Sequence, residues 1–176
     1  GALAEGPSAQ PGRMSEPEAI LAATARLLAP EGPLKGKLVL VTAGPTREHI
    51  DPMRVITNPS SGRMGYALAE AASARGAEVL LVTGPTALAL PAGATAHRVE
   101  TTAEMQRAVQ SLVKRADVLI MAAAPADFRP ATIATVKRPR TAGAMTLELV
   151  ATPDILRSLD RPEGCVVVGF ALETGG

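Results

Sequence analysis

Aromatic side chains are almost absent from this sequence, which has two phenylalanines, one tyrosine and no tryptophan among 176 residues. Proteins that hold single-stranded nucleic acid by stacking its bases need aromatic platforms, so the composition argues against that class. The 47% hydrophobic content must come mainly from Ala, Val and Leu, a composition typical of α/β proteins. A chain of this length can bury a core as one domain.

Cysteine occurs once, as Cys165, and histidine twice, as His49 and His97. One thiol builds no disulfide framework, and the set is too small for a zinc site. Cys165 lies in an apolar run, where we expect a small buried hydrophobe. The net charge of +1 gives no field that attracts nucleic acid. With no apolar run long enough for a bilayer and no leader pattern, the sequence predicts a soluble, cytoplasmic protein without nucleic-acid or membrane partners.

A regular alternation of apolar strands and helices begins at Lys37. Residues 1–36 are interpreted as a flexible linker with a short helix, the junction from an upstream domain. Strands are predicted at 38–43, 77–83, 95–100, 117–123, 145–151 and 165–171, and helices at 66–75, 101–115 and briefly after Thr152. This pattern predicts an α/β fold, a Rossmann-like three-layer domain with a mostly parallel sheet and helices on both faces. Ligands then bind beyond the carboxyl ends of the strands.

The stretch 57–65, Thr-Asn-Pro-Ser-Ser-Gly-Arg-Met-Gly, leads into the first helix. Ser61 and Gly62 stand at the helix start, where backbone N–H groups and the helix dipole favour an anion. An ordinary N-cap by Ser60 or Ser61 is the simpler alternative. Because a cap needs only one such residue, we favour phosphate binding.

The segment 44–59 separates the first strand from this helix and is predicted to be a long loop. Gly44 follows the strand directly, but Gly62 and Gly65 come only after the loop, so the tight glycine turn of a dinucleotide site is broken. The loop carries the polar residues Arg47, Glu48, His49, Asp51, Arg54 and Asn58. Long loops in compact domains are usually functional or disordered, and this one is predicted to be functional.

Two later stretches also follow strand ends. Ala123 and Ala124 leave room for a ligand, while Asp127 either accepts hydrogen bonds from a base or ribose, helps to hold a metal, or simply forms a turn. Phe170 ends the last strand and either packs in the core or lies against a nucleobase.

Between them, residues 128–147 contain no acidic residue and four cations, Arg129, Lys137, Arg138 and Arg140. This basic segment suits a mobile cover for a polyphosphate, although a solvated surface run is the commoner outcome. No nucleophile elbow, Ser/His/Asp set or metal-binding histidine pair occurs. The residues therefore indicate nucleotide-dependent chemistry driven by positioning and electrostatics.

The motifs at 41–48, 50–52, 54–58 and 60–65, followed by those at 122–129 and 167–174, closely resemble bacterial phosphopantothenoylcysteine synthetase. This is the C-terminal half of the bifunctional coenzyme A biosynthesis flavoprotein, a phosphopantothenoylcysteine decarboxylase and phosphopantothenate–cysteine ligase. The resemblance implies that 4′-phosphopantothenate attacks the α-phosphate of CTP, giving an acyl-cytidylate and pyrophosphate. The amine of L-cysteine then displaces CMP, and Mg²⁺ accompanies the triphosphate.

The resemblance also implies roles for individual residues. Asn58 handles the acyl-nucleotide by donating to its acyl oxygen, and Lys137 offsets charge in the first half-reaction; these two are the expected catalytic residues. The expected nucleotide-binding residues are Gly44, Ser61, Gly62, Asp127, Lys137, Val167, Val168, Gly169 and Phe170. The expected substrate-binding residues are Arg54, Asn58, Ala123 and Ala124. Residues 138–146 match a mobile flap, and no protein residue is expected to ligate a metal.

Residues 37–176 would then be a nucleotide-binding ligase domain, truncated because members of this family continue past the Glu173-Thr174 motif. The resemblance further implies a homodimer whose partner subunit helps to close the site, and a fused decarboxylase domain upstream. Two alternatives remain open. A catalytically silent nucleotide-binding fragment is one, and an NAD(P)-dependent oxidoreductase is the other, although strand 77–83 ends in Thr83-Gly84-Pro85 without the expected acidic residue.

Overall fold

The computed structural model describes residues 32–140 and 144–172, together with Met14, Pro17, Ile20, Leu21, Ala23 and Thr24. Of these isolated positions, all but Met14 are helical. Residues 32–36 at the end of the expected linker are also described, and 33–36 form a turn; the rest of the linker lies outside the described residues. The division into a linker and a ligase domain stays a prediction.

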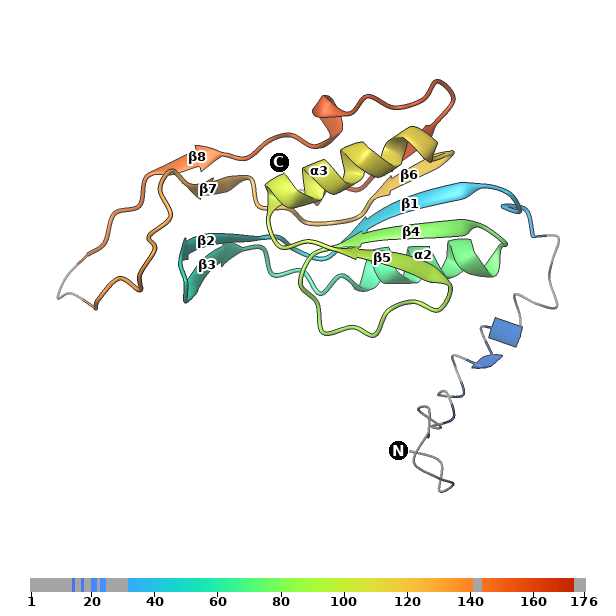
Figure 1. Cartoon of the computed structure of the whole chain (residues 1–176), viewed down its shortest axis with the longest axis horizontal. Coiled ribbons are helices and arrows are strands. Elements are labelled where there is room, and N and C mark those ends of the chain that lie inside the picture. The colour runs from blue at the N-terminus through green and yellow to red at the C-terminus, as the bar shows by residue number, and fades with distance from the viewer. Residues whose placement is uncertain are drawn as a thin grey trace, which may run out of the picture.

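A five-stranded parallel sheet forms the body of the domain (Figure 1). Its strands are β1 (Leu38–Ala43), β4 (Glu78–Thr83), β5 (Ala94–Arg98), β6 (Val118–Met121) and β9 (Val166–Gly169). Their order is β5-β4-β1-β6-β9, so successive crossovers run to one side of β1 and then to the other. The switch point, where ligands of such sheets bind, lies between the carboxyl ends of β1 and β6. The predicted Rossmann-like α/β fold is confirmed.

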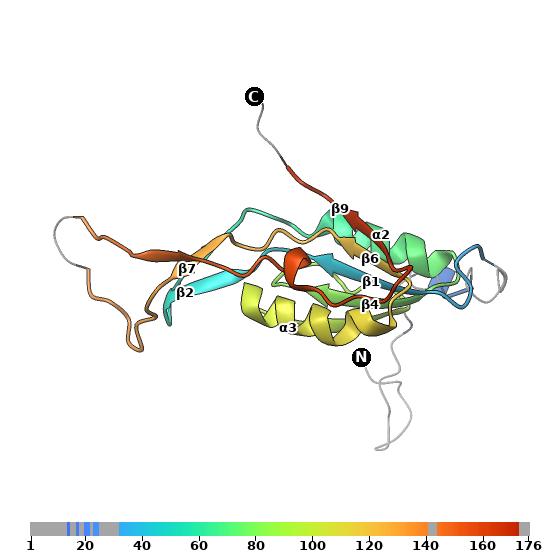
Figure 2. The ribbon, with the colours of Figure 1, turned by 90° about the horizontal axis from the view of Figure 1, so that it is seen from above.

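Two helices cover the sheet from opposite faces (Figure 2). All six residues of β1 are buried, which explains why its sequence is a continuous apolar run. Leu38 and Leu40 join the core on the side of α3 (Thr102–Leu112), whereas Val39 and Val41 join the core on the side of α2 (Arg63–Ala74). A capping box at Thr101 opens α3 as predicted, and a 3-10 turn, Val113–Arg115, closes it.

A slender arm projects from the carboxyl end of the sheet (Figures 1 and 2). It consists of two antiparallel pairs, β2 (Arg47–Asp51) with β3 (Arg54–Thr57), and β7 (Phe128–Pro130) with β8 (Leu149–Ala151). Strand β2 also contacts β7, which joins the two pairs. We call these four strands and their connecting segments the arm.

The arm corrects two predictions. Segment 44–59 is not a loop, because it forms the β2–β3 hairpin. The strand predicted at 145–151 is reduced to Leu149–Ala151 and lies in the arm, so it adds no strand to the main sheet. The hairpin was missed because β2 buries the polar residues Glu48 and Asp51 and so shows no apolar run. The strand at 145–151 was misplaced because its apolar residues pair with β7 outside the core.

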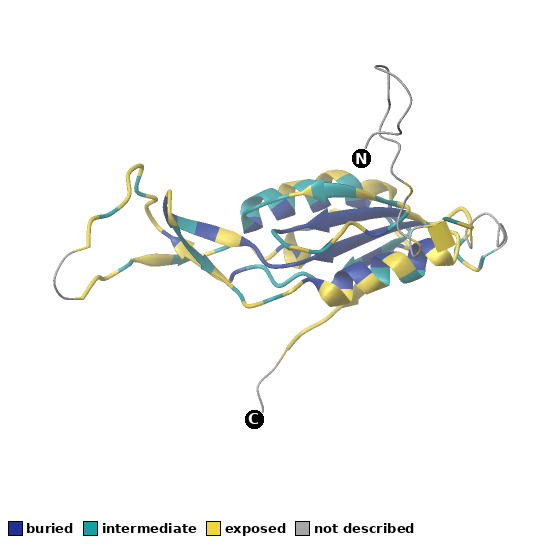
Figure 3. Ribbon diagram, turned by 90° about the horizontal axis from the view of Figure 1, so that it is seen from below, coloured by how far each residue is buried: buried dark blue, intermediate teal, exposed yellow. Residues whose placement is uncertain are grey.

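Burial is concentrated in the sheet, while the arm is largely exposed (Figure 3). Cys165 is buried in the core on the α3 side, and burial raises the pKa of its thiol, as expected of a packing residue. A 3-10 turn, Leu156–Ser158, replaces the short helix predicted after Thr152. Within the described residues, no helix has the length and apolarity to cross a bilayer.

Gly65 allows α2 to approach β1 closely. A Cβ atom built at this position would stand 2.5 Å from the Cβ of Ala43 and 2.9 Å from the carbonyl oxygen of Thr42. We predict that Gly65→Ala lowers the free energy of unfolding by about 1–3 kcal/mol, the usual cost of overpacking a close contact. Urea denaturation measures the change. Gly169→Ala is the matched control, because nothing lies within 4 Å of its added Cβ; an equal loss in both variants would contradict the close-approach explanation.

Candidate functional site

The floor of the candidate site is a seam between the residues that follow β1 and those that follow β6. Pro45 forms a parallel bridge with Ala124, and the amide of Ala124 donates to the carbonyl oxygen of Gly44 at 2.9 Å. Two threonine side chains continue the seam. The hydroxyl of Thr42 accepts a hydrogen bond from the backbone amide of Ala123 at 3.1 Å, and the hydroxyl of Thr46 accepts one from the backbone amide of Ala126 at 2.9 Å. At the switch point, backbone bonds and buried hydroxyl groups therefore hold the residues after β1 against those after β6.

Asn58 lies directly over this seam. Its side-chain Nδ2 donates to the carbonyl oxygens of Pro125 at 2.9 Å and of Ala124 at 3.3 Å. Two carbonyl acceptors fix the amide orientation, because its own oxygen would repel them. The structure therefore brings together three of the expected substrate-binding residues, namely Asn58, Ala123 and Ala124.

The helix start beside the seam is only weakly capped. Gly62 occupies the N-cap position with φ 78°, in the left-handed region that favours glycine. The hydroxyls of Ser60 and Ser61 accept from the amides of Gly62 and Arg63, but both contacts are long at 3.4 Å. The ordinary capping alternative is thus poorly satisfied, and the helix start keeps the character of an anion seat.

Glycines at this edge also serve packing. Cβ atoms added to Gly44 and Gly62 would each stand 2.8 Å from the Cγ2 methyl of Thr86. Both glycines also have positive φ, a conformation that favours glycine. The connections after β1, β3 and β4 fit together because Gly44 and Gly62 have no side chains. Room for a phosphate is therefore not the sole reason for glycine at these positions.

The ends of β6 and β9 place the expected base-binding residues at the same edge. Phe170 donates its amide to the carbonyl oxygen of Met121 at 3.2 Å and is 48% exposed, which rules out the core alternative in the described structure. On β9, Val167 is half-buried, whereas Val168 and Gly169 are exposed. Asp127 is exposed, and its carboxylate makes no hydrogen bond with the described residues. These groups are free to meet a ligand.

Arg54 and Lys137 lie elsewhere in the arm, at and beside the β2–β3 turn. Arg54 begins β3, and its Nη2 donates to the carbonyl oxygen of Arg138 at 2.8 Å. Lys137, the preceding residue, is exposed. Asn58 follows the other end of β3, so within one chain the structure separates these two residues from the seam and the helix start. Residues 141–143 of the expected flap lie outside the described residues.

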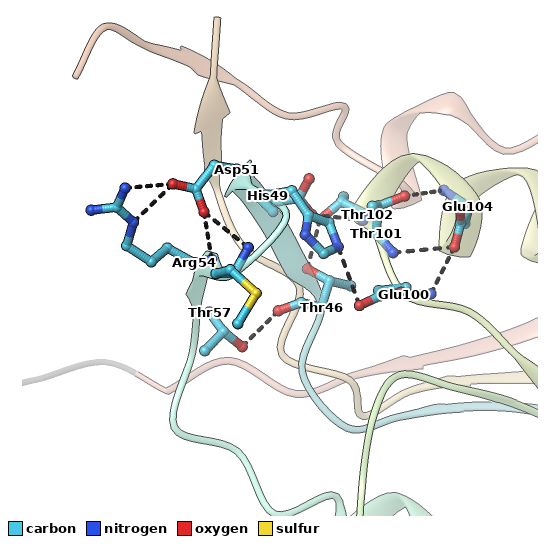
Figure 4. Close-up of polar contacts among 11 residues, drawn as sticks. Thr46, His49, Asp51, Arg54, Thr57, Glu100, Thr101, Thr102 and Glu104 are labelled. Carbon is cyan, nitrogen blue, oxygen red and sulfur yellow. Dashed lines mark hydrogen bonds and ion pairs between the residues drawn. The ribbon is translucent and has the colours of Figure 1, made fainter. Parts of the chain in front are cut away.

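Sequence reasoning missed a buried polar joint at the root of the arm (Figure 4). Glu48, 4% exposed, accepts from the amide of Thr102 at 2.8 Å and from its hydroxyl at 2.9 Å. The hydroxyls of Thr46 and Thr102 lie 2.9 Å apart. A carboxylate at the start of α3 is favoured by the helix dipole. The capping box marked this helix start, but nothing in the sequence linked it to Glu48.

A separate recess of about 700 Å³ lies on the β4–β5 side of the seam. Arg47, Arg98, Thr86 and Glu100 are among its lining residues, and none of the expected site residues is. Its two carboxylates are engaged: Glu104 accepts from the amide of Glu100 at 2.7 Å, and Glu100 lies 3.2 Å from Nε2 of His49. The recess is therefore distinct from the seam.

Fold and site together define a class of protein: a Rossmann-like α/β domain with the expected substrate-binding residues Asn58, Ala123 and Ala124 gathered at its switch point and an inserted β-arm. The model of the family "DNA/pantothenate metabolism flavoprotein C-terminal domain" matches residues 34–176, and the chain belongs to this family. This match confirms the resemblance drawn from the motifs.

Relatives are considerably longer than this chain. It is 48% identical over 167 residues to the coenzyme A biosynthesis bifunctional protein CoaBC of Bacillus subtilis, covering 93% of this chain and 41% of the relative. Against CoaBC of Escherichia coli, identity is 42% over 172 residues, covering 93% and 42%. The chain thus spans about two fifths of the length of these curated relatives.

Solved structures with the same fold include a domain of a CoaBC protein. The crystal structure of the C-terminal domain of a CoaBC protein has a TM-score of 0.69 and 46% identity, covering 80% of this chain and 66% of that one. A Cab2 variant in complex with phosphopantothenate-cysteine has a TM-score of 0.67 and 18% identity, covering 89% and 69%. The second likeness concerns the fold alone.

Asp51 generates a pH prediction. Its carboxylate is fully buried, and hydrogen bonds from Arg54 first, then from the amides of Met53 and Arg138, hold its pKa well below the usual range despite burial. A group whose folded pKa lies below its unfolded value of about 3.9 stabilises the fold above that pH and loses this contribution as the pH falls.

We therefore predict that Asp51→Asn lowers the free energy of unfolding at pH 7, and that its difference from wild type shrinks below about pH 4. Urea denaturation between pH 7 and pH 3 tests this. The exposed Asp154, which pairs with Arg157, provides the control Asp154→Asn. A difference between wild type and Asp51→Asn that stayed constant with pH would contradict the assignment.

Proposed function

We propose that this domain is the phosphopantothenate–cysteine ligase of coenzyme A biosynthesis. It activates the carboxylate of 4′-phosphopantothenate with CTP, forming an acyl-cytidylate with release of pyrophosphate. The amine of L-cysteine then attacks the acyl carbon, and CMP leaves as the amide forms. The observation that carries the proposal is the Asn58 amide fixed over the β1–β6 seam beside a weakly capped helix start, in a chain 48% identical to a CoaBC protein.

The geometry supports a positioning mechanism. The triphosphate docks against the amides at the start of α2, and the acyl group lies over Ala123 and Ala124. The longer of the two Asn58 bonds, that to Ala124, is the one an acyl oxygen replaces. Phe170 and the end of β9 receive the base. Mg²⁺ bound to the triphosphate would offset the negative charge of its phosphates.

The alternatives are less well supported. An oxidoreductase of this fold needs a tight glycine turn after β1, whereas here a hairpin of two strands intervenes before Gly62. A silent nucleotide-binding fragment would bind CTP without releasing pyrophosphate, so turnover distinguishes it from the ligase. The relatives are named bifunctional and are more than twice as long as the matched region, which supports a second fused domain. That this domain is an upstream decarboxylase, and that the protein is cytoplasmic, belong to the proposal.

We predict a division of labour between the two expected catalytic residues. In the full-length gene product, Asn58→Ala should leave pyrophosphate release intact but stall amide formation, whereas Lys137→Ala should block the first step by about 100-fold or more, since charge on the phosphate is no longer offset. Pyrophosphate release and phosphopantothenoylcysteine formation are measured separately. Equal loss of both steps in both variants would refute the division.

We further propose a homodimer in which the arm of one copy closes the crevice of the other. The arm carries exposed apolar side chains, with Met53 70%, Phe128 54% and Leu149 43% exposed, and its β2–β3 turn holds the segment of Lys137 away from its own Asn58. Such a contact buries the apolar residues of the arm and completes both sites by symmetry.

Complementation tests this dimer. Mixing the inactive Asn58→Ala and Lys137→Ala proteins after dissociation should restore about a quarter of wild-type activity, because half of the dimers are mixed and each contains one intact site. Sedimentation equilibrium gives the oligomeric state. Phe128→Glu should weaken the dimer, while Leu156→Glu, a residue 45% exposed outside the arm, should not. Mixed dimers without activity would place Lys137 in the site of its own chain.

A further inference from the structure

Asp51 lies at the centre of the hydrogen bonds at the β2–β3 turn of the arm (Figure 4). Its Oδ1 accepts from the amides of Met53 at 2.9 Å and Arg54 at 3.0 Å, which shape the β2–β3 turn. Its Oδ2 accepts from Nε and Nη2 of Arg54 at 2.9 and 2.5 Å. A fully buried carboxylate is costly unless it is paired and hydrogen-bonded, and here both oxygens are satisfied.

The same carboxylate reaches a second segment that is distant in the sequence. The amide of Arg138 donates to Oδ2 of Asp51 at 3.1 Å, and Nη2 of Arg54 donates to the carbonyl oxygen of Arg138. The backbone N–H and C=O of Arg138 are thus both held by the Asp51–Arg54 pair. One further bond, from the amide of Ala134 to the carbonyl oxygen of Ile50 at 3.0 Å, fastens the same segment to β2.

We call the bonds of Asp51 and Arg54 to the backbone of Arg138 the clamp. Lys137 directly precedes Arg138. Its own side chain is exposed and makes no hydrogen bond or ion pair with the residues that the structure describes. The segment 131–138 has no regular secondary structure, so its position depends on these few bonds. What the clamp fixes is therefore the base of the Lys137 side chain, while the ammonium group stays available.

We propose that Asp51 is a positioning residue for the first half-reaction, which it serves by holding Arg54 and the backbone of Arg138 so that Lys137 stands ready beside the β2–β3 turn. This inference rests on the proposed ligase function. It gives Arg54 a second task, since two of its guanidinium nitrogens are committed to the clamp. It also explains why the Asp51 carboxylate is fully buried in an arm that is largely exposed.

The test combines a structural and a chemical readout on Asp51→Asn. Asparagine has nearly the same size, but its NH₂ group would face backbone and guanidinium N–H groups that donate to the carboxylate in wild type. Trypsin cleavage after Lys137 should become about tenfold faster, the effect expected from losing one charge-assisted hydrogen bond. In the full-length gene product, pyrophosphate release should slow by a similar factor, whereas the reaction of L-cysteine with added acyl-cytidylate should not change.

The controls separate the clamp from general destabilisation. Asp154→Asn removes an exposed carboxylate outside the arm and should leave cleavage and both half-reactions as in wild type. Arg54→Lys keeps the charge but not the fork that bridges Asp51 and Arg138, so it should accelerate the same cut. An unchanged cleavage rate in Asp51→Asn would overturn the clamp, and equal slowing of both half-reactions would overturn the positioning role. Absence of pyrophosphate release in wild type would instead refute the proposed function.

Discussion

The structure depends on a buried hydroxyl pair, Thr46 and Thr102, whose oxygens lie 2.9 Å apart at the point where sheet, helix and arm meet. Thr46 also accepts from the amide of Ala126, and Thr102 donates to Glu48. Three chain segments, around Thr46 and Glu48, Thr102 and Ala126, are therefore fixed relative to one another by buried groups. A missing partner in such a network costs more than an ordinary hydrogen bond contributes, so the joint holds a single geometry.

This joint divides the molecule into two functional regions. On the sheet side, Asn58 and the residues after β6 are held in place by backbone carbonyls and threonine hydroxyls. On the arm side, the hairpin carries Arg54 outward, and the segment of Lys137 follows it. Asn58 and the segment of Lys137 therefore lie in different regions of one chain. In the proposed dimer, the second copy would supply Lys137 to the region that holds Asn58.

Elements that depend on local sequence patterns could be predicted, whereas those that depend on contacts between residues far apart in the sequence could not. Strands β1 and β4 were recognisable because burial on both faces demands a local apolar run. Strands β6 and β9 were also recognised from their apolar sequences, although β9 is largely exposed. The β2–β3 hairpin was not, because Glu48 is paired only with Thr102, 54 residues away, and Asp51 adds to its local partners a bond to Arg138, 87 residues away. A polar residue with a distant partner has the same local pattern as a solvated one. Asn58 and the Ser61-Gly62 helix start were indicated by local motifs, whereas Glu48 and Asp51 could be assigned only from the structure.

Burying two carboxylates in a small arm is a poor way to gain stability, since the cost of desolvation offsets most of the attraction. Apolar residues of similar volume would serve stability as well. What they would not provide is a unique register, because Asp51 requires both the tight β2–β3 turn and the backbone of Arg138. Chemistry that relies on positioning needs that uniqueness more than it needs stability, since a displacement of about 1 Å can cost 100-fold in rate. The polar arm is thus consistent with a ligase that supplies few reactive groups and places them accurately.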